Sequence, residues 1–139
     1  MSFSVTATVH INQQALMRAM QAAAKPALYE AAALVEAEMK ALVPVDTGAL
    51  RESIHLEQRE MGPYFHQVSV HPAEIAGNKW GLDPAYARRI EYGFIGQDSL
   101  GRNYHQAARP YVRPAAESTR EAVQDTLRAT FANAAGEFE

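Results

Sequence analysis

A long amphipathic helix between Ala27 and Val43 is the feature of this sequence that most constrains its fold. Apolar residues recur there at alternating spacings of four and three, so they form one stripe, and charged residues such as Glu36 occupy the remaining surface. The stripe consists of Leu28, Ala32, Val35, Met39 and Leu42. We expect this stripe to pack against another element and Pro44 to end the helix, because proline disfavours helical backbone in the residue before it.

Two elements are expected before this helix. Residues 3–11 alternate apolar and polar side chains, which is the two-residue period of a half-buried strand. A helical segment follows, with Asn12 as its N-cap. Pro26 is expected to kink or interrupt that segment before the longer helix begins.

A β-hairpin is predicted next, because residues 53–60 and 64–71 flank a Met-Gly-Pro turn at residues 61–63. In the register that this turn favours, His55 lies opposite Ser69, and the apolar residues of both strands share one face. The apolar face is formed by Ile54, Leu56, Val68 and Val70. The other face is mostly polar, which is typical of an antiparallel sheet with one solvated face, and we expect a helix to cover the apolar one.

The second half of the chain contains two further predicted helices. Asp83 caps a short helix over Pro84–Tyr92, and Gly93 ends it. Residues 94–108 have no consistent period and contain glycine and turn residues, so they are expected to form a long loop. The last helix covers Pro114–Gly136. Its apolar stripe consists of Ala116, Val123, Leu127, Phe131 and Ala134.

The order of these elements predicts an α+β fold. It is an antiparallel sheet with a long amphipathic helix and a C-terminal helix packed on one face. The 139 residues fit a single domain, residues 1–139, that is long enough to bury its own core. The sequence has no cysteine, which excludes disulfides and thiolate metal sites.

The charge distribution argues against a general nucleic-acid-binding protein. The formal net charge is −3, and no segment approaches the roughly 20 apolar residues of a membrane-spanning helix. Residues 79–113 carry six basic residues against three acidic ones, whereas residues 27–57 carry two against six. Oppositely charged regions of this kind suit self-association, and scattered surface charge explains them equally well.

The sequence contains no recognisable motif for catalysis. HExxH, GxSxG and P-loop patterns are absent. His55 and His71 share the polar face of the predicted hairpin, but separated exposed histidines are far more often surface residues than metal ligands. Glu36 and Glu38 are two residues apart on a helix and therefore face different ways. We expect no catalytic residues, no metal site and no cofactor, and hence no enzyme.

Aromatic and basic side chains are interleaved between residues 86 and 113. They are Tyr86, Arg88, Arg89, Tyr92, Tyr104, Arg109, Tyr111 and Arg113. Such residues can stack on bases and bind phosphates, as in a DNA-binding factor. The same residues are also interpretable as packing and capping groups of a short helix and a loop, and Tyr and Arg are equally the composition of protein interfaces. Between DNA contact and contact between subunits, we favour contact between subunits.

Three segments resemble, in the same order, the motifs of a siphophage minor tail-component family, the neck and tail-completion proteins. Residues 43–54, VPVDTGALRESI, are similar to its P-V-D-T-G-x-L-x-x-S-I signature. Residues 86–93, YARRIEYG, resemble its Y-A-x-x-V-E-Y-G element, and residues 108–115, ARPYVRPA, resemble its x-x-P-F-L-R-P-A segment. With the helices between them, these motifs cover the chain from about residue 27 to 135.

Each motif also has a local structural interpretation. In the first, Asp46 and Thr47 can accept hydrogen bonds from nearby backbone N–H groups, and Gly48 can take a positive φ, so the helix turns sharply into the hairpin. The residues of this structural motif are Pro44, Asp46, Thr47, Gly48 and Leu50. Glu91 either pairs with an arginine of the same or a neighbouring subunit or is solvated, and Arg113 can reach a carboxylate. The candidate subunit-interface residues are Tyr86, Arg88, Arg89, Glu91, Tyr92, Gly93, Arg109, Tyr111 and Arg113.

The resemblance implies a structural virion protein that joins the phage head to the tail. Its subunits would form a ring, expected to be a hexamer, at the neck or tail top, around a channel that DNA traverses without specific binding. The implied partners are other copies of the chain and neighbouring neck, tail-terminator or tail-tube proteins. Assembly would take place in the cytoplasm of the bacterial host, without a membrane. Two alternatives stay open: a tail terminator that caps the tail tube, and a DNA-binding accessory factor.

Overall fold

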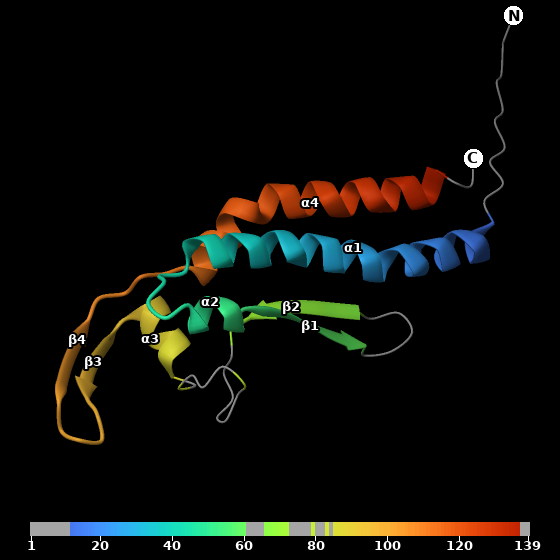
Figure 1. Ribbon diagram of the computed structural model, residues 1–139. Helices are drawn as coiled ribbons and strands as arrows, with labels where there is room; N and C mark the ends of the chain where they lie inside the picture. Colours follow the sequence, from blue (N-terminus) through green and yellow to red (C-terminus); the bar gives the residue numbers. More distant parts are fainter. Residues whose placement is uncertain (1–11, 61–65, 73–78, 80–82, 84, 137–139) are drawn as a thin grey trace, which may run out of the picture.

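The computed structural model describes residues 12–60, 66–72, 79, 83 and 85–136. Within these residues the chain forms two long helices, two short helices and two antiparallel hairpins (Figure 1). The strand predicted over residues 3–11 lies outside the described residues.

The first helix, α1, spans Gln13–Leu42 as one element. The Asn12 side chain caps it, because its oxygen accepts a hydrogen bond from the backbone N–H of Ala15 at 3.1 Å. The predicted interruption at Pro26 does not occur. Pro26 removes one intrahelical hydrogen bond, but Ala27 directly after it is fully buried, and burial of one face supplies most of the stability of a helix.

A five-residue helix, α2 (Ala49–Ser53), follows the turn after α1 and is absent from the sequence prediction. The hydroxyl of Ser53 donates a hydrogen bond to the carbonyl oxygen of Leu50 at 2.7 Å. Both residues are buried, and so is Ile54. Because α2 carries the chain into the core, the following strand begins at His55 and not at residue 53.

Strands β1 (His55–Glu60) and β2 (His66–His71) form the predicted antiparallel hairpin, in a different register. His55 lies opposite His71 and not opposite Ser69, the partner that the apolar pattern predicts. The connection is therefore two residues longer than predicted. A shift of two residues returns every side chain to the same face, so the apolar residues still share one side of the sheet.

Helices α3 (Tyr86–Tyr92) and α4 (Val112–Gly136) correspond to the two helices predicted in the second half of the chain. Gly93 is the C-cap of α3, as the sequence predicts. α4 begins two residues before Pro114. A proline is tolerated in the first turn of a helix because its missing N–H has no intrahelical partner there.

A second hairpin occupies most of residues 94–108, so the prediction of a long loop is wrong. Strand β3 (Phe94–Gln97) pairs antiparallel with β4 (Asn103–Gln106). At the tip, the Asp98 carboxylate accepts hydrogen bonds from two backbone N–H groups of the turn, both at 2.9 Å. These bonds stabilise strands that are too short to show a clear period in the sequence. Figure 1 shows that this hairpin projects away from the long helices.

α1 lies between α4 and the β1–β2 sheet (Figure 1), and the fold is α+β, as predicted. The core lies where the C-terminal end of α1 meets α2, α3 and the start of α4. It contains Met39, Val43, Leu50, Ile54, Ala87, Ile90, Tyr111 and Ala115. In the described segments, no helix combines the length and the apolar content that crossing a membrane requires.

Candidate functional site

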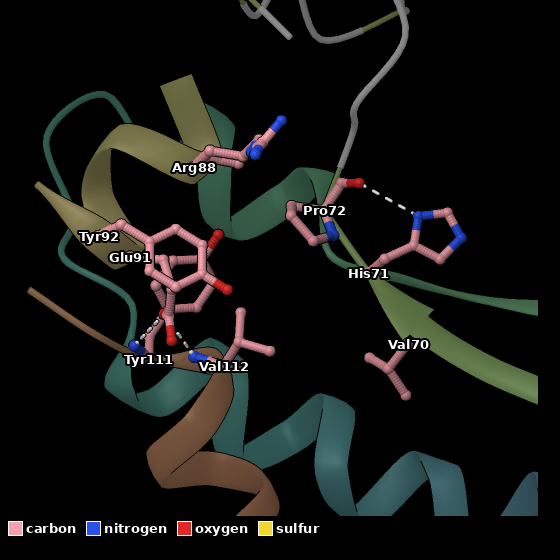
Figure 2. A pocket seen from close by; sticks show the side chains of 9 residues that line it. Val70, His71, Pro72, Arg88, Glu91, Tyr92, Tyr111 and Val112 are labelled. Atoms are coloured by element: carbon pink, nitrogen blue, oxygen red, sulfur yellow. Dashed lines mark hydrogen bonds between the residues drawn. The ribbon is translucent and has the colours of Figure 1, made fainter. Parts of the chain in front are cut away.

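Glu91, near the end of α3, is a buried carboxylate with an exposed fraction of 8%. Its oxygens accept hydrogen bonds from the backbone N–H groups of Tyr111 at 2.7 Å, Val112 at 2.9 Å and Arg113 at 3.2 Å. Figure 2 shows the first two of these bonds. The first N–H groups of a helix have no intrahelical acceptor, and the helix dipole favours negative charge beside them. Glu91 therefore caps the N-terminus of α4.

A backbone hydrogen bond reinforces this junction between α3 and α4. The N–H of Arg109 donates to the carbonyl oxygen of Ile90 at 2.8 Å. The Tyr111 side chain has no exposed surface and packs in the core with Ala115. The YARRIEYG and ARPYVRPA segments, which are separate motifs in the sequence, therefore form one structural unit.

The sequence does not predict the capping role of Glu91, although it contains one signal for it. Tyr111, the residue before α4, is not one of the Ser, Thr, Asp or Asn residues that usually cap a helix. A helix start without a local cap indicates that the acceptor comes from elsewhere in the chain. The sequence does not show which acidic residue provides it.

Gly93 carries the chain from α3 into β3 at a point where another backbone segment passes close by. Its φ is 77°, a conformation that favours glycine. A Cβ at this position would lie 2.8 Å from the carbonyl oxygen of Gln106 and 2.9 Å from the backbone nitrogen of Ala108. A side chain therefore does not fit here unless the backbone moves.

The VPVDTGALRESI segment forms the turn between α1 and α2. Gly48 has a φ of 85° and is the N-cap residue of α2, and the Thr47 hydroxyl accepts a hydrogen bond from the N–H of Ala49 at 3.4 Å. The Asp46 side chain is exposed and makes no hydrogen bond with the described residues. The turn directs Leu50, which is 4% exposed, into the core, so this segment has an architectural role.

The predicted interface residues do not all lie on the surface. Four of them are exposed, namely Arg88, Tyr92, Arg109 and Arg113. Three others are partly exposed, namely Tyr86, Arg89 and Gly93. Glu91 and Tyr111 are buried within the subunit. Their expected role in contact between subunits is therefore corrected: Glu91 caps α4, and Tyr111 is a core residue.

Three of the exposed arginines have no acidic partner in the part of the chain that the structure describes. They are Arg88, Arg109 and Arg113. Arg89 differs from them, because its guanidinium lies 3.8 Å from the carboxylate of Asp83 and 4.5 Å from the ring centre of Phe94. A basic region that no described acidic side chain neutralises thus lies where α3, the end of the β3–β4 hairpin and the start of α4 meet.

A cleft of about 260 Å³ opens beside this region, between β2, α3 and the start of α4 (Figure 2). It is lined by Val70, His71, Pro72, Ala87, Arg88, Glu91, Tyr92, Tyr111 and Val112. The Glu91 carboxylate in its wall already accepts backbone N–H groups with both oxygens. Its position in the wall is therefore explained by its role as the cap of α4.

His55 and His71 lie side by side on the solvated face of the β1–β2 sheet, with ring centres 4.6 Å apart. Nε2 of His71 lies 2.9 Å from a carboxylate oxygen of Glu57, and this hydrogen bond, with the charge of Arg59, lowers the pKa of the Glu57 carboxyl. Among the described residues, no group of three or more His, Asp or Glu side chains is arranged to hold a metal ion.

Residues 12–93 match the model of a protein family described as "Bacteriophage HK97-gp10, putative tail-component". The chain belongs to this HK97-gp10-like family. The match covers more than half of the 139 residues and includes residues 43–54 and 86–93, which carry the first two motifs. No curated protein and no solved structure matches the chain.

Membership in the HK97-gp10-like family confirms the resemblance to phage tail components. The protein is therefore a structural component of a bacteriophage tail. The third motif, residues 108–115, lies outside the matched residues. The structure connects it to the second motif through the hydrogen bonds of Glu91.

Proposed function

We propose that this tail component joins the DNA-filled head to the tail, as a ring of identical subunits around the DNA channel at the neck or the top of the tail tube. The observation that carries the proposal is the match of residues 12–93 to the HK97-gp10-like family. We also propose that the ring is a hexamer and that it contacts neck, tail-terminator or tail-tube proteins. Its assembly would take place in the host cytoplasm.

The surface of the subunit supports a role in assembly. Large apolar side chains are exposed at Tyr92, Ile95 and Leu100, each at least 75% exposed, at the end of α3 and along the β3–β4 hairpin, whose base carries the exposed residues Arg88 and Arg109. Exposed aromatic and aliphatic side chains beside unneutralised charge are typical of surfaces that bind another protein. The formal net charge of −3 suits a channel wall that does not retain moving DNA.

A phage in which this gene is disabled provides the test, with the particles examined by electron microscopy. Head-to-tail joining predicts that DNA-filled heads and complete tails accumulate separately and that added purified protein joins them. A tail terminator predicts tails of uncontrolled length instead, because an uncapped tube continues to grow. Normal joined particles in the absence of the protein would refute both functions.

A DNA-binding accessory factor is the second candidate. The exposed side chains of Arg88, Arg109 and Arg113 favour it, because the described residues do not neutralise them and Tyr92 lies among them. Binding of this kind depends strongly on salt concentration, because neutralised phosphates release counterions. Salt-dependent duplex binding by the purified protein, together with normal joining in its absence, would favour this candidate.

A further inference from the structure

The β3–β4 hairpin, Phe94–Gln106, forms an arm that projects from the rest of the subunit (Figure 1). The arm exposes two large aliphatic side chains, Ile95 at 77% and Leu100 at 75%, and Tyr104 is 41% exposed. An isolated two-stranded hairpin is marginally stable in water. A projecting arm with exposed apolar side chains therefore gains stability by docking on another surface.

The subunit also has an apolar groove that its own arm does not fill. The groove runs between α1, β2 and α4, has a volume of about 330 Å³ and is lined entirely by apolar residues. The lining residues are Leu28, Ala31, Ala32, Val35, Met39, Val68, Val70, Val112, Ala116, Val123 and Leu127. In Figure 1 the arm points away from the length of α1 and α4 along which most of these residues lie.

We propose that the arm of one subunit docks in the α1–β2–α4 groove of a second copy of this chain. The arm and the groove are different surfaces of the same subunit, so the contact is heterologous, and repetition of a heterologous contact produces a ring when the rotation closes. This inference rests on the proposed function and specifies which surfaces form the ring. Ile95 and Leu100 supply the apolar contacts.

Charge complementarity favours a second copy as the occupant of the groove. Arg88 and Arg109 flank the base of the arm, exposed and without an acidic partner in the described part of the chain. On α4, beside groove residues Ala116 and Val123, Glu117 and Glu121 are exposed and lack a basic partner there. The arginines at the base of the arm and the glutamates of α4 carry opposite charges, so they attract each other when the arm of one copy meets α4 of the next.

Disulfide trapping tests this contact directly, because the chain has no cysteine of its own. One copy carries Leu100→Cys and an affinity tag, and a second, untagged copy carries Ala116→Cys. Both copies are expressed together during infection by the phage that lacks the gene, and tails are purified under mild oxidation. The proposal predicts a mixed disulfide dimer, both in tails and in concentrated purified protein.

The matched control replaces Ala116→Cys by Ala132→Cys, at an exposed position nearer the far end of α4. The proposal predicts at least tenfold less mixed dimer for this pair. Equal trapping of both pairs would overturn it, as would no trapping of the Ala116→Cys pair in either preparation. A strong link from Ala116→Cys to another tail protein would also overturn it.

Substitutions on the arm give an independent measurement. Ile95→Asp and Leu100→Asp should weaken self-association at least tenfold with an unchanged circular dichroism spectrum, whereas Gln97→Asp, an exposed polar position on the same arm, should not. If Ile95→Asp and Leu100→Asp both form rings normally, in a phage that needs the protein to join heads and tails, the arm contact is wrong and the proposed function stands. If the arm substitutions abolish the rings, but the phage joins heads and tails without the protein, the proposed function is wrong and the arm contact stands.

Discussion

The carboxylate of Glu91 lies 2.7 Å from the backbone nitrogen of Tyr111, and this contact joins two elements that are 20 residues apart in the sequence. It fixes the end of α3 to the start of α4. Since the β3–β4 arm leaves α3 through Gly93, the same contact helps to set the orientation of the arm relative to the two long helices.

Replacing Glu91 by alanine is expected to lower the free energy of unfolding by about 1–3 kcal/mol, because three backbone N–H groups lose a charged acceptor. Glu91→Gln should lose less, because its amide retains one acceptor oxygen. Urea denaturation followed by circular dichroism measures both changes. Glu117→Ala, at an exposed position on α4, is the control and should change stability by under about 0.5 kcal/mol. Similar losses for Glu91→Ala and Glu117→Ala would contradict the capping role.

Gly93→Ala should destabilise the protein more than Gly101→Ala. Both glycines have a positive φ, 77° and 75°, so both variants carry the backbone strain of a side chain in that region, about 1 kcal/mol. Only at Gly93 would the new Cβ meet backbone atoms, at 2.8 and 2.9 Å, whereas nothing lies within 4 Å at Gly101. Denaturation midpoints of the two variants compare these costs. Equal midpoints would show that the close approach of residues 106–108 is relaxed in solution.

The register of the first hairpin shows a limit of prediction from sequence. An apolar pattern distinguishes one face of a strand from the other, but a shift of two residues leaves both faces unchanged. The pattern therefore identified both strands and their apolar face, but each observed strand begins two residues later than predicted, and His55 was placed opposite the wrong residue. The end of α3 at Gly93 was predictable because it depends on residues close together in the chain. The stripe predicted on α1 is only partly correct: Met39 is buried, Leu42 is 41% exposed, and the buried residues Ala27 and Ala31 were not predicted.

The pH dependence of the arm should follow Asp98. Hydrogen bonds from the backbone N–H and guanidinium of Arg102, with others from Leu100 and Tyr104, hold the pKa of the Asp98 carboxyl below its usual 3.8. A depressed folded-state pKa means that the stabilisation is present above pH 3.8 and is lost as the pH falls through the lower folded value. Chemical shifts of β3 and β4 should therefore move toward disordered values only below pH 3.8.

Asp98→Asn is expected to loosen the turn already at neutral pH, since it removes the charge that these donors bind. Ser99→Ala, a change at the neighbouring exposed residue, is the matched control and should leave the arm unchanged. Hydrogen exchange of the β3 and β4 amides distinguishes the two variants. Unchanged protection in Asp98→Asn would show that strand pairing alone maintains the arm.

The arm and the Glu91 cap were missed for the same physical reason. Each depends on a carboxylate that accepts several backbone hydrogen bonds, and such an acceptor leaves no period in the sequence. Asp98 does so within a turn whose flanking strands have only four residues each. Glu91 does so across 20 residues, where the sequence offered a salt bridge or a solvated carboxylate as the natural interpretations.

Reversing Arg109 or Arg113 to glutamate should separate folding from assembly. Both side chains are exposed and have no acidic partner among the described residues, so the circular dichroism spectrum and denaturation midpoint should hardly change. Like charges at a subunit contact should weaken self-association by roughly tenfold or more, measured by light scattering, and block phage complementation. Arg18→Glu makes the same charge change at the opposite end of α1, where we expect no loss of assembly. If Arg109→Glu and Arg113→Glu instead assemble and complement normally, while losing low-salt affinity for duplex DNA, then this basic region contacts nucleic acid and not a neighbouring subunit.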